Sequence, residues 1–194
     1  MKKKIAGIDY SLTSPAICVY KDENGGHFDF DRCVFYYLSN TEKQRQSAAR
    51  CGLDNLRAEP YPEWKSEEER HEKLATWAYN IVQGSEEVFL EGYAFATSAQ
   101  AGVRSIAENT GLLKHKMWKN KIPFKTYPPT VIKKFATGKG NSNKELMYEA
   151  FVDELLTPID LKELLTPKAK KVISPISDIV DSYFITKCGE EGML

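Results

Sequence analysis

The first 37 residues contain three apolar runs with the length and composition of β-strands, at about 4–9, 15–21 and 27–37. The polar turn DENGG joins the second run to the third, as in a hairpin. Three consecutive strands with short connections predict an antiparallel meander. In the rest of the chain, strand-like runs alternate with helical patterns, so the whole predicts a mixed sheet flanked by helices.

Hydrophobic periodicity places the later elements. Two strands are predicted, VFLE at 88–91 and a second within IPFKTYPP. Ser174 and Pro175 have the residue types of an N-cap and first turn, and so mark the start of the last helix. Helices are predicted at about 66–83, 97–119, 130–135, 144–156 and 174–189. The segments 39–65 and 157–173 lack periodicity and are interpreted as irregular insertions, the first with a short helix.

The length and composition favour one soluble domain. A chain of 194 residues can bury a sizeable core, and its 42% hydrophobic and 28% charged content is ordinary for a globular protein. It has neither an apolar run of membrane-spanning length nor a signal-peptide segment after the lysine-rich start. The four scattered cysteines lack metal-site spacing, which predicts reduced thiols in a cytoplasmic protein.

The formal net charge is zero, but the charges are distributed unevenly. The segment 109–144 has nine lysines and no acidic residue, whereas 59–72 contains six glutamates. A cationic surface attracts phosphate backbones largely regardless of sequence. The alternative is a solvated lysine face; we favour a polyanionic partner.

Four carboxylates fall where they could meet. Asp9 ends the first strand and Glu91 ends the strand VFLE, so both emerge at one edge if these strands are parallel neighbours. Asp178 and Asp181 are three residues apart on the last helix and are therefore neighbours. Taken singly, Asp9 could start a turn and the helical pair could be solvated. Together, four acids would repel one another unless neutralised, and two Mg²⁺ ions, or Mn²⁺, suit such hard oxygen ligands.

With these four acids in this order, the sequence resembles the RuvC-type Holliday junction resolvases, which have the RNase H fold. IAGIDYSLTSPAICVY is similar to the family's first motif, VFLEGYAF to the segment with its glutamate, and DIVDSYFIT to its final motif. The resemblance implies one RNase H-like domain over 1–194 with a mixed five-stranded sheet. It also implies a Mg²⁺-dependent endonuclease that resolves Holliday junctions or other branched DNA by phosphodiester hydrolysis. The matching residues that carry this chemistry are Asp9, Glu91, Asp178 and Asp181.

The resemblance extends to DNA contacts. YPPTVIKKFATGKGNSNKELM is similar to the family's basic stretch, in which a Gly-x-Gly turn leads to a lysine near the scissile strand. Lys144 takes that position as a catalytic and DNA-binding residue. Further phosphate contacts are expected from Lys133, Lys134 and Lys139.

Two aromatic residues, Tyr93 and Phe95, follow Glu91. An aromatic near this point acts at the junction centre in the family, and stacking on a base is worth ~1–3 kcal/mol. Ordinary core packing is the alternative for both side chains. The family also implies a homodimer, for which we expect the helix at 97–119 to supply the interface.

Two segments depart from the bacterial pattern: 39–73 is longer and more acidic, and 157–173 is a lysine-rich addition. In this divergence the chain resembles viral members, which accept several branched DNAs; a phage origin would place it in the host cytoplasm. Two other functions stay open. A non-catalytic junction-binding protein of the same fold is expected to have lost some of the four acids. An actin- or sugar-kinase-type ATPase would share GIDYSLTSPA but needs a second glycine-rich motif, and ATP turnover would distinguish it.

Overall fold

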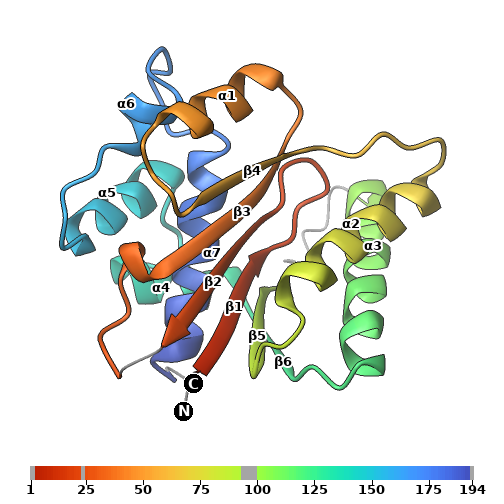
Figure 1. The fold of residues 1–194 in the computed structure, drawn as a ribbon. Coiled ribbons are helices and arrows are strands. Elements are labelled where there is room, and N and C mark those ends of the chain that lie inside the picture. The colour runs from red at the N-terminus through yellow and green to blue at the C-terminus, as the bar shows by residue number, and fades with distance from the viewer. Residues whose placement is uncertain (1–2, 23–24, 93–99, 193–194) are drawn as a thin grey trace.

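The computed structural model describes residues 3–22, 25–92 and 100–192. These residues form a six-stranded mixed sheet in the order β4-β3-β2-β1-β5-β6, with helices on both faces (Figure 1). The strands are β1 (Lys3–Asp9), β2 (Ala16–Asp22), β3 (Cys33–Ser39), β4 (Leu56–Pro60), β5 (Glu87–Glu91) and β6 (Phe124–Tyr127). The α-helices are α1 (Glu42–Arg50), α2 (Glu67–Val82), α3 (Gln100–Lys119), α4 (Pro129–Thr137), α5 (Lys144–Glu154), α6 (Leu161–Leu165) and α7 (Ile176–Glu190).

The strand directions confirm the predicted mixed sheet. β1, β2 and β3 form an antiparallel meander, whereas β5 pairs in parallel with β1 and β6 in parallel with β5. The predicted number of five strands is wrong, because β4 pairs in parallel with β3 and adds a sixth strand at the edge.

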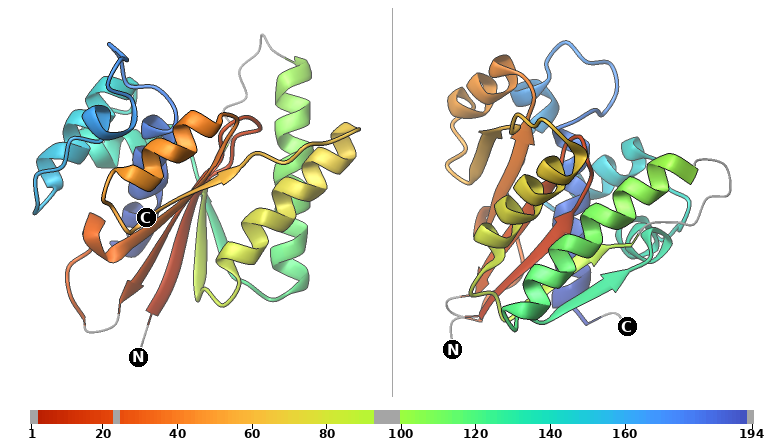
Figure 2. Two further views of the ribbon diagram at one scale, coloured as in Figure 1. Left: turned by 45° about the horizontal axis from the view of Figure 1, so that its top comes forward. Right: turned by 90° about the vertical axis from the view of Figure 1, so that its right-hand side faces the viewer.

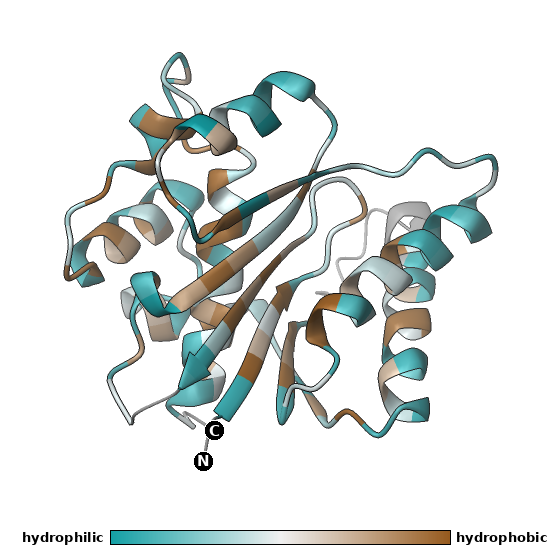
Figure 3. Ribbon diagram, in the orientation of Figure 1, coloured by the Kyte–Doolittle hydropathy of each residue, from teal (hydrophilic) through white to brown (hydrophobic). Residues whose placement is uncertain are grey.

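The two faces of the sheet bury different cores. Side chains alternate along a strand, so neighbouring residues of β1 point to opposite faces. Ile5 packs in the cluster that includes α5 and α7, whereas Ala6 and Ile8 pack in the cluster that includes α2 and α3. Figure 2 shows the pair α2 and α3 covering one face, and Figure 3 shows the apolar residues concentrated on the central strands and on the inner sides of the helices.

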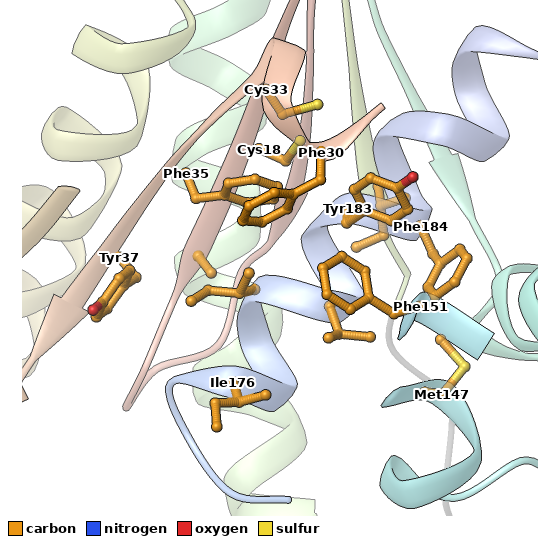
Figure 4. Packing of buried hydrophobic residues seen from close by; sticks show 14 of the residues in the cluster. Cys18, Phe30, Cys33, Phe35, Tyr37, Met147, Phe151, Ile176, Tyr183 and Phe184 are labelled. Atoms are coloured by element: carbon orange, nitrogen blue, oxygen red, sulfur yellow. The ribbon is translucent and has the colours of Figure 1, made fainter. Parts of the chain in front are cut away.

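Helix α7 lies very close to β1 because β1 has a glycine, Gly7, at the point of contact. A Cβ atom on Gly7 would lie 2.3 Å from Thr186 Oγ1 and 2.9 Å from the carbonyl oxygen of Ser182, so only glycine fits there. Farther out, aromatic side chains from the meander, α5 and α7 fill the core (Figure 4). Among them, Phe151 and Tyr183 meet edge to face with ring centroids 5.1 Å apart. This packing fixes α7 against the centre of the sheet.

The predicted helices are present with small shifts at their ends. The Ser66 hydroxyl accepts a hydrogen bond from the backbone N–H of Glu69 and caps α2. Asn143 caps α5 in the same way by accepting from Leu146 N–H. The predicted helix at 97–119 corresponds to α3, although 97–99 lies outside the described residues.

The segment 39–65 contains the predicted short helix, α1, but the interpretation of its remainder as irregular is wrong, because Leu56–Pro60 forms the strand β4. The interpretation of 157–173 as irregular is also wrong, because this segment contains the short helix α6. The third strand begins only at Cys33, because Phe30–Arg32 form a 3₁₀ turn whose Phe30 is buried. In each case a short polar segment acquires its structure from a few buried side chains, which periodicity does not detect.

The predicted N-cap of the last helix is also misplaced. Helix α7 begins at Ile176 with Pro175 as its N-cap, and the peptide bond between Ser174 and Pro175 is cis. The Ser174 hydroxyl does not cap the helix and is directed to Asp178. Within the described part of the chain, no helix is both long and apolar enough to cross a membrane.

Candidate active site

Asp9 and Glu91 end adjacent parallel strands on the same face of the sheet. The β1–β5 register pairs Ile8 with Leu90, so each carboxylate directly follows the last pair. Asp9 shares the face of Ile5 and Gly7, and Glu91 shares the face of Phe89, because strand residues two apart point the same way. This face is the one that α7 covers. The predicted meeting of the two strands at one edge is therefore confirmed in the structure.

Asp178 and Asp181 lie in the first two turns of α7, near this edge. The interpretation of the pair as solvated is wrong for Asp178, which is only 6% exposed. Helix α7 buries residues on nearly all sides, so the side opposite its aliphatic stripe faces the strand ends and not solvent. The helix thus brings two acids to the carboxylates of β1 and β5.

The four acids are close enough to affect one another's protonation. Burial raises the pKa of Asp9 well above its usual value, and the nearby charges of Asp181, Asp178 and Glu91 raise it further, whereas Lys144 opposes the shift. Like charges held in a poorly solvated site disfavour ionisation of each member. Asp9 is thus the member of the cluster on which the charges of the other three acids act together.

The pKa of Asp181 is raised for the same two reasons, burial and the charges of neighbouring acids. Burial raises the pKa of Asp181 to about 7, with further contributions from Glu91 and Asp178, and the charges of Lys144 and Lys133 act in the opposite direction. Burial also raises the pKa of Glu91, which Lys133 partly offsets. A pKa this high for an aspartate means that the cluster holds protons near neutral pH unless a cation replaces them.

Asp178 differs from the other acids because serine hydroxyls hold it. Burial raises its pKa, and hydrogen bonds from Ser174 and Ser177 and the charge of Lys144 limit the rise. The Ser177 hydroxyl donates to Asp178 Oδ1 at 3.1 Å, and the Ser174 hydroxyl donates to Oδ2. Lys144 Nζ in turn donates to Ser177 Oγ at 3.1 Å. Sequence reasoning missed both serines in this role, although hydroxyls one and four residues before an aspartate are a usable signal.

The lysines predicted to bind DNA separate into two groups. Lys133 and Lys144 lie near the carboxylates, since each lowers the pKa of at least one of them. Lys134 and Lys139 are exposed. Lys139 lines a separate cleft whose other charged residues are acidic: Glu149, Asp153 and Glu154. The predicted base-stacking residues Tyr93 and Phe95 lie outside the described residues.

The donor set at this edge fits a hard divalent cation, because it consists of carboxylate oxygens that repel one another. Across the described residues, no three His, Cys, Asp or Glu side chains are already arranged as a metal centre. Asp178 is directed to its serines, so it would have to exchange those hydrogen bonds to coordinate a metal ion. The four acids therefore have the ligand chemistry and the location that a divalent cation requires.

The meander, the two parallel strands and the helix across β1 together define the RNase H-like fold of the RuvC-type resolvases. The T. thermophilus RuvC in complex with Holliday junction substrate matches with a TM-score of 0.60 and 13% identity, over 98% of this chain and 96% of that chain. Fowlpox virus resolvase, solved with substrate Holliday junction DNA, matches with a TM-score of 0.53 and 14% identity over 99% of both chains.

A third structure, the yeast mitochondrial Holliday junction resolvase Ydc2, matches with a TM-score of 0.54 and 12% identity over 95% of this chain and 76% of that chain. No protein-family model and no curated protein sequence matches the chain. The fold predicted from the four motifs is thus confirmed by shape, at sequence identities too low to carry residue roles across.

Proposed function

We propose that this protein is a metal-dependent, structure-selective DNA endonuclease that resolves Holliday junctions or other branched DNA. The observation that carries the proposal is the convergence of Asp9, Glu91, Asp178 and Asp181 on one edge of the sheet. Burial raises the pKa of all four, and the charges of neighbouring acids raise those of Asp9 and Asp181 further. The junction-resolving neighbours support the substrate class. Buried carboxylates that raise one another's pKa mark a functional site more often than a structural one.

In this proposal the four carboxylates hold two divalent ions, Mg²⁺ or Mn²⁺. When bound, such ions stabilise the attacking and leaving oxygens of phosphodiester hydrolysis. Asp9 and Glu91 provide ligands from rigid strand ends, and Asp181 provides one from α7. Asp178 is oriented by its serines, and Lys144 next to Ser177 supplies positive charge beside the scissile phosphate. Lys133 lies near Glu91 and binds an adjacent phosphate.

We also propose that the protein acts as a homodimer. A four-way junction offers two equivalent strands, and a two-fold dimer presents one site to each. The helix α3 is our candidate for the interface. Sedimentation at micromolar concentration, with and without junction DNA, tests this part, and a monomer under both conditions would contradict it.

The decisive experiment is cleavage of a synthetic four-way junction with and without Mg²⁺, together with gel-shift binding in Ca²⁺ or EDTA. Wild-type protein should cut only with Mg²⁺ or Mn²⁺. Asp9→Asn keeps the side-chain shape and removes a charged ligand, so it should abolish cleavage while junction affinity stays within about threefold, because phosphate contacts dominate binding. Binding without cleavage by the wild type would indicate a junction-binding protein, and cleavage by Asp9→Asn at the wild-type rate would exclude Asp9 as a ligand.

A further inference from the structure

Parts of the two segments that depart from the bacterial pattern lie together at one end of the molecule. Helix α1 packs against α6, and Figure 1 shows both at the end of the sheet where α7 begins. The chain that follows α6, residues 166–173, completes this region, which we call the insertion surface: α1 and 166–173. Between its two parts lies a cleft of about 340 Å³.

The cleft has apolar walls and a cationic rim. Leu165, Pro167 and Ile173 line it from one side, and Lys43 from α1 and Lys168 from 166–173 both line it as well. Both lysines are exposed. Lys170 and Lys171 are also exposed in the same stretch, which contains no acidic residue. A concave apolar surface with lysines around it suits a sugar–phosphate backbone, because deoxyribose contributes C–H groups and the phosphates contribute charge.

The lysine ammonium groups have no partners among the described residues. The ion pairs of this part of the chain involve other residues, such as Arg45 with Glu42 and Lys162 with Glu145. Lys43, Lys168, Lys170 and Lys171 make no ion pair or side-chain hydrogen bond with any residue in the described ranges. The positive charge of this surface is therefore available to a ligand.

The surface is also held firmly in place. Leu161, Leu165 and Val172 are buried, and the backbone N–H of Val172 donates to Glu145 Oε1 at 2.7 Å. These anchors fix both ends of the lysine-bearing stretch against the core. A lysine stretch that only served solubility would not need such anchors.

Hydrogen bonds place the insertion surface next to the carboxylates. Gln44 of α1 lines the cleft, and its Nε2 donates to the carbonyl oxygen of Ser174 at 3.4 Å. The Ser174 hydroxyl in turn donates to Asp178. Lys168 precedes Ser174 by six residues, so it lies at most about 21 Å away along an extended chain. At one phosphate per 3.4 Å of helix axis on each strand, this distance corresponds to about six base pairs.

We propose that the insertion surface is a second DNA-binding site, which holds the phosphate backbone of one duplex arm within about six base pairs of the cut. The inference rests on the proposed function and adds to it a surface outside the basic segment 109–144. It assigns a DNA-contacting role to Lys43 and Lys168, which sequence analysis did not single out. Neither residue touches the reacting phosphate.

The test compares two double variants with the wild type. Lys43→Ala/Lys168→Ala removes two rim lysines, and Lys3→Ala/Lys21→Ala removes two lysines at the opposite end of the sheet, outside both the basic segment 109–144 and α3. The rim variant should flatten the slope of log affinity against log salt by about 1.8, or 0.9 per lost phosphate contact. The control variant should keep the wild-type slope. Single-turnover cleavage at saturating protein should stay within about twofold for the control variant, and the rim variant should lose cleavage at subsaturating protein in proportion to its weaker binding.

Junctions in which selected phosphates are replaced by uncharged methylphosphonates provide a second test of the same contacts. Methylphosphonates at the first six phosphates of one arm should weaken binding by the wild type but add little to the loss in the rim variant, because the same contacts have already been removed. If the wild type binds and cuts junctions while the rim and control variants behave alike, this inference is wrong and the proposed function stands. If the wild type neither binds nor cuts, both are wrong.

Discussion

The two faces of the sheet use neighbouring residues of the same strands for different purposes. On the α2–α3 side, Ile8 and Leu90 lie in a mainly apolar core. One residue further on, Asp9 and Glu91 point to the α7 side and join an anionic cluster. Because alternate strand residues face opposite ways, the first face can supply stability while the second carries charge that opposes it. The comparison teaches that the apolar core on the α2–α3 face stabilises the strands whose ends carry the clustered carboxylates of the candidate site.

The largest effect should be a loss of cleavage when Glu91 is substituted, in contrast to Glu87, which lies on the same face of the same strand. Glu87 and Glu91 both lie on β5 and point to the same face, but Glu87 pairs with Lys125 at 3.1 Å at the opposite end. Glu91→Gln should reduce the junction cleavage rate at least about 1000-fold, equivalent to about 4 kcal/mol of transition-state stabilisation. Glu87→Gln should leave the rate within about twofold. Equal losses in a single-turnover assay would show that the effect is general and not specific to the site.

The next prediction compares the stability effect of replacing a glycine on each side of the sheet, Gly7 on the α7 side and Gly111 on α3. Gly7→Ala places a Cβ against Thr186 on the α7 side and should destabilise the protein by about 1–3 kcal/mol. Gly111→Ala, on α3, meets no atom within 4 Å and should be neutral or stabilising by up to about 1 kcal/mol through helix propensity. Urea unfolding measures both variants. Destabilisation by both would mean that close helix–strand packing is not particular to the α7 side.

A smaller effect should appear in the pH dependence of stability. The pKa of Asp181 is raised to about 7, so the folded state binds this proton more tightly than the unfolded chain does. Stability should therefore fall as pH rises from about 4, the pKa of an unfolded aspartate, and level off above pH 7. In EDTA at pH 8, Asp181→Asn should have a Tm at least about 3 °C above the wild type, or about 1 kcal/mol at this chain length.

At pH 3.5 the two Tm values should nearly coincide, because Asp181 is then largely protonated in both the folded and the unfolded state. Asp153→Asn, at an exposed position of α5, is the control and should leave Tm unchanged at both pH values. Addition of Mg²⁺ should raise the Tm of the wild type more than that of Asp181→Asn. A wild-type Tm that rises from pH 5 to pH 8 in EDTA would contradict the electrostatic account.

Parts of the fold and site could be predicted because they depend on local patterns. Strand ends at Asp9 and Glu91 follow from apolar runs, and parallel pairing then brings them together. The strand β4 could not be predicted, since Leu56–Pro60 is short, contains Arg57, Glu59 and a proline, and becomes a strand only by pairing with β3. The burial of Asp178 was missed because periodicity assigns one exposed side to a helix, whereas α7 is covered on nearly all sides.

The smallest expected effect separates two lysines that the sequence treats as equivalent. Lys133 and Lys139 belong to the same basic segment, but Lys133 lies near Glu91 and Asp181, whereas Lys139 lines the cleft with Glu149, Asp153 and Glu154. In the proposed function phosphates approach the carboxylate edge, so Lys133→Ala should flatten the salt dependence of junction binding by about 0.9.

Lys139→Ala should change the slope by less than half as much, because the neighbouring acids weaken any phosphate contact there. The measurement is gel-shift affinity across a salt series in Ca²⁺, with circular dichroism to confirm folding. Equal flattening by the two substitutions would show that DNA also covers the Lys139 cleft, and the division of the basic segment into a site-facing part and an outlying part would then fail.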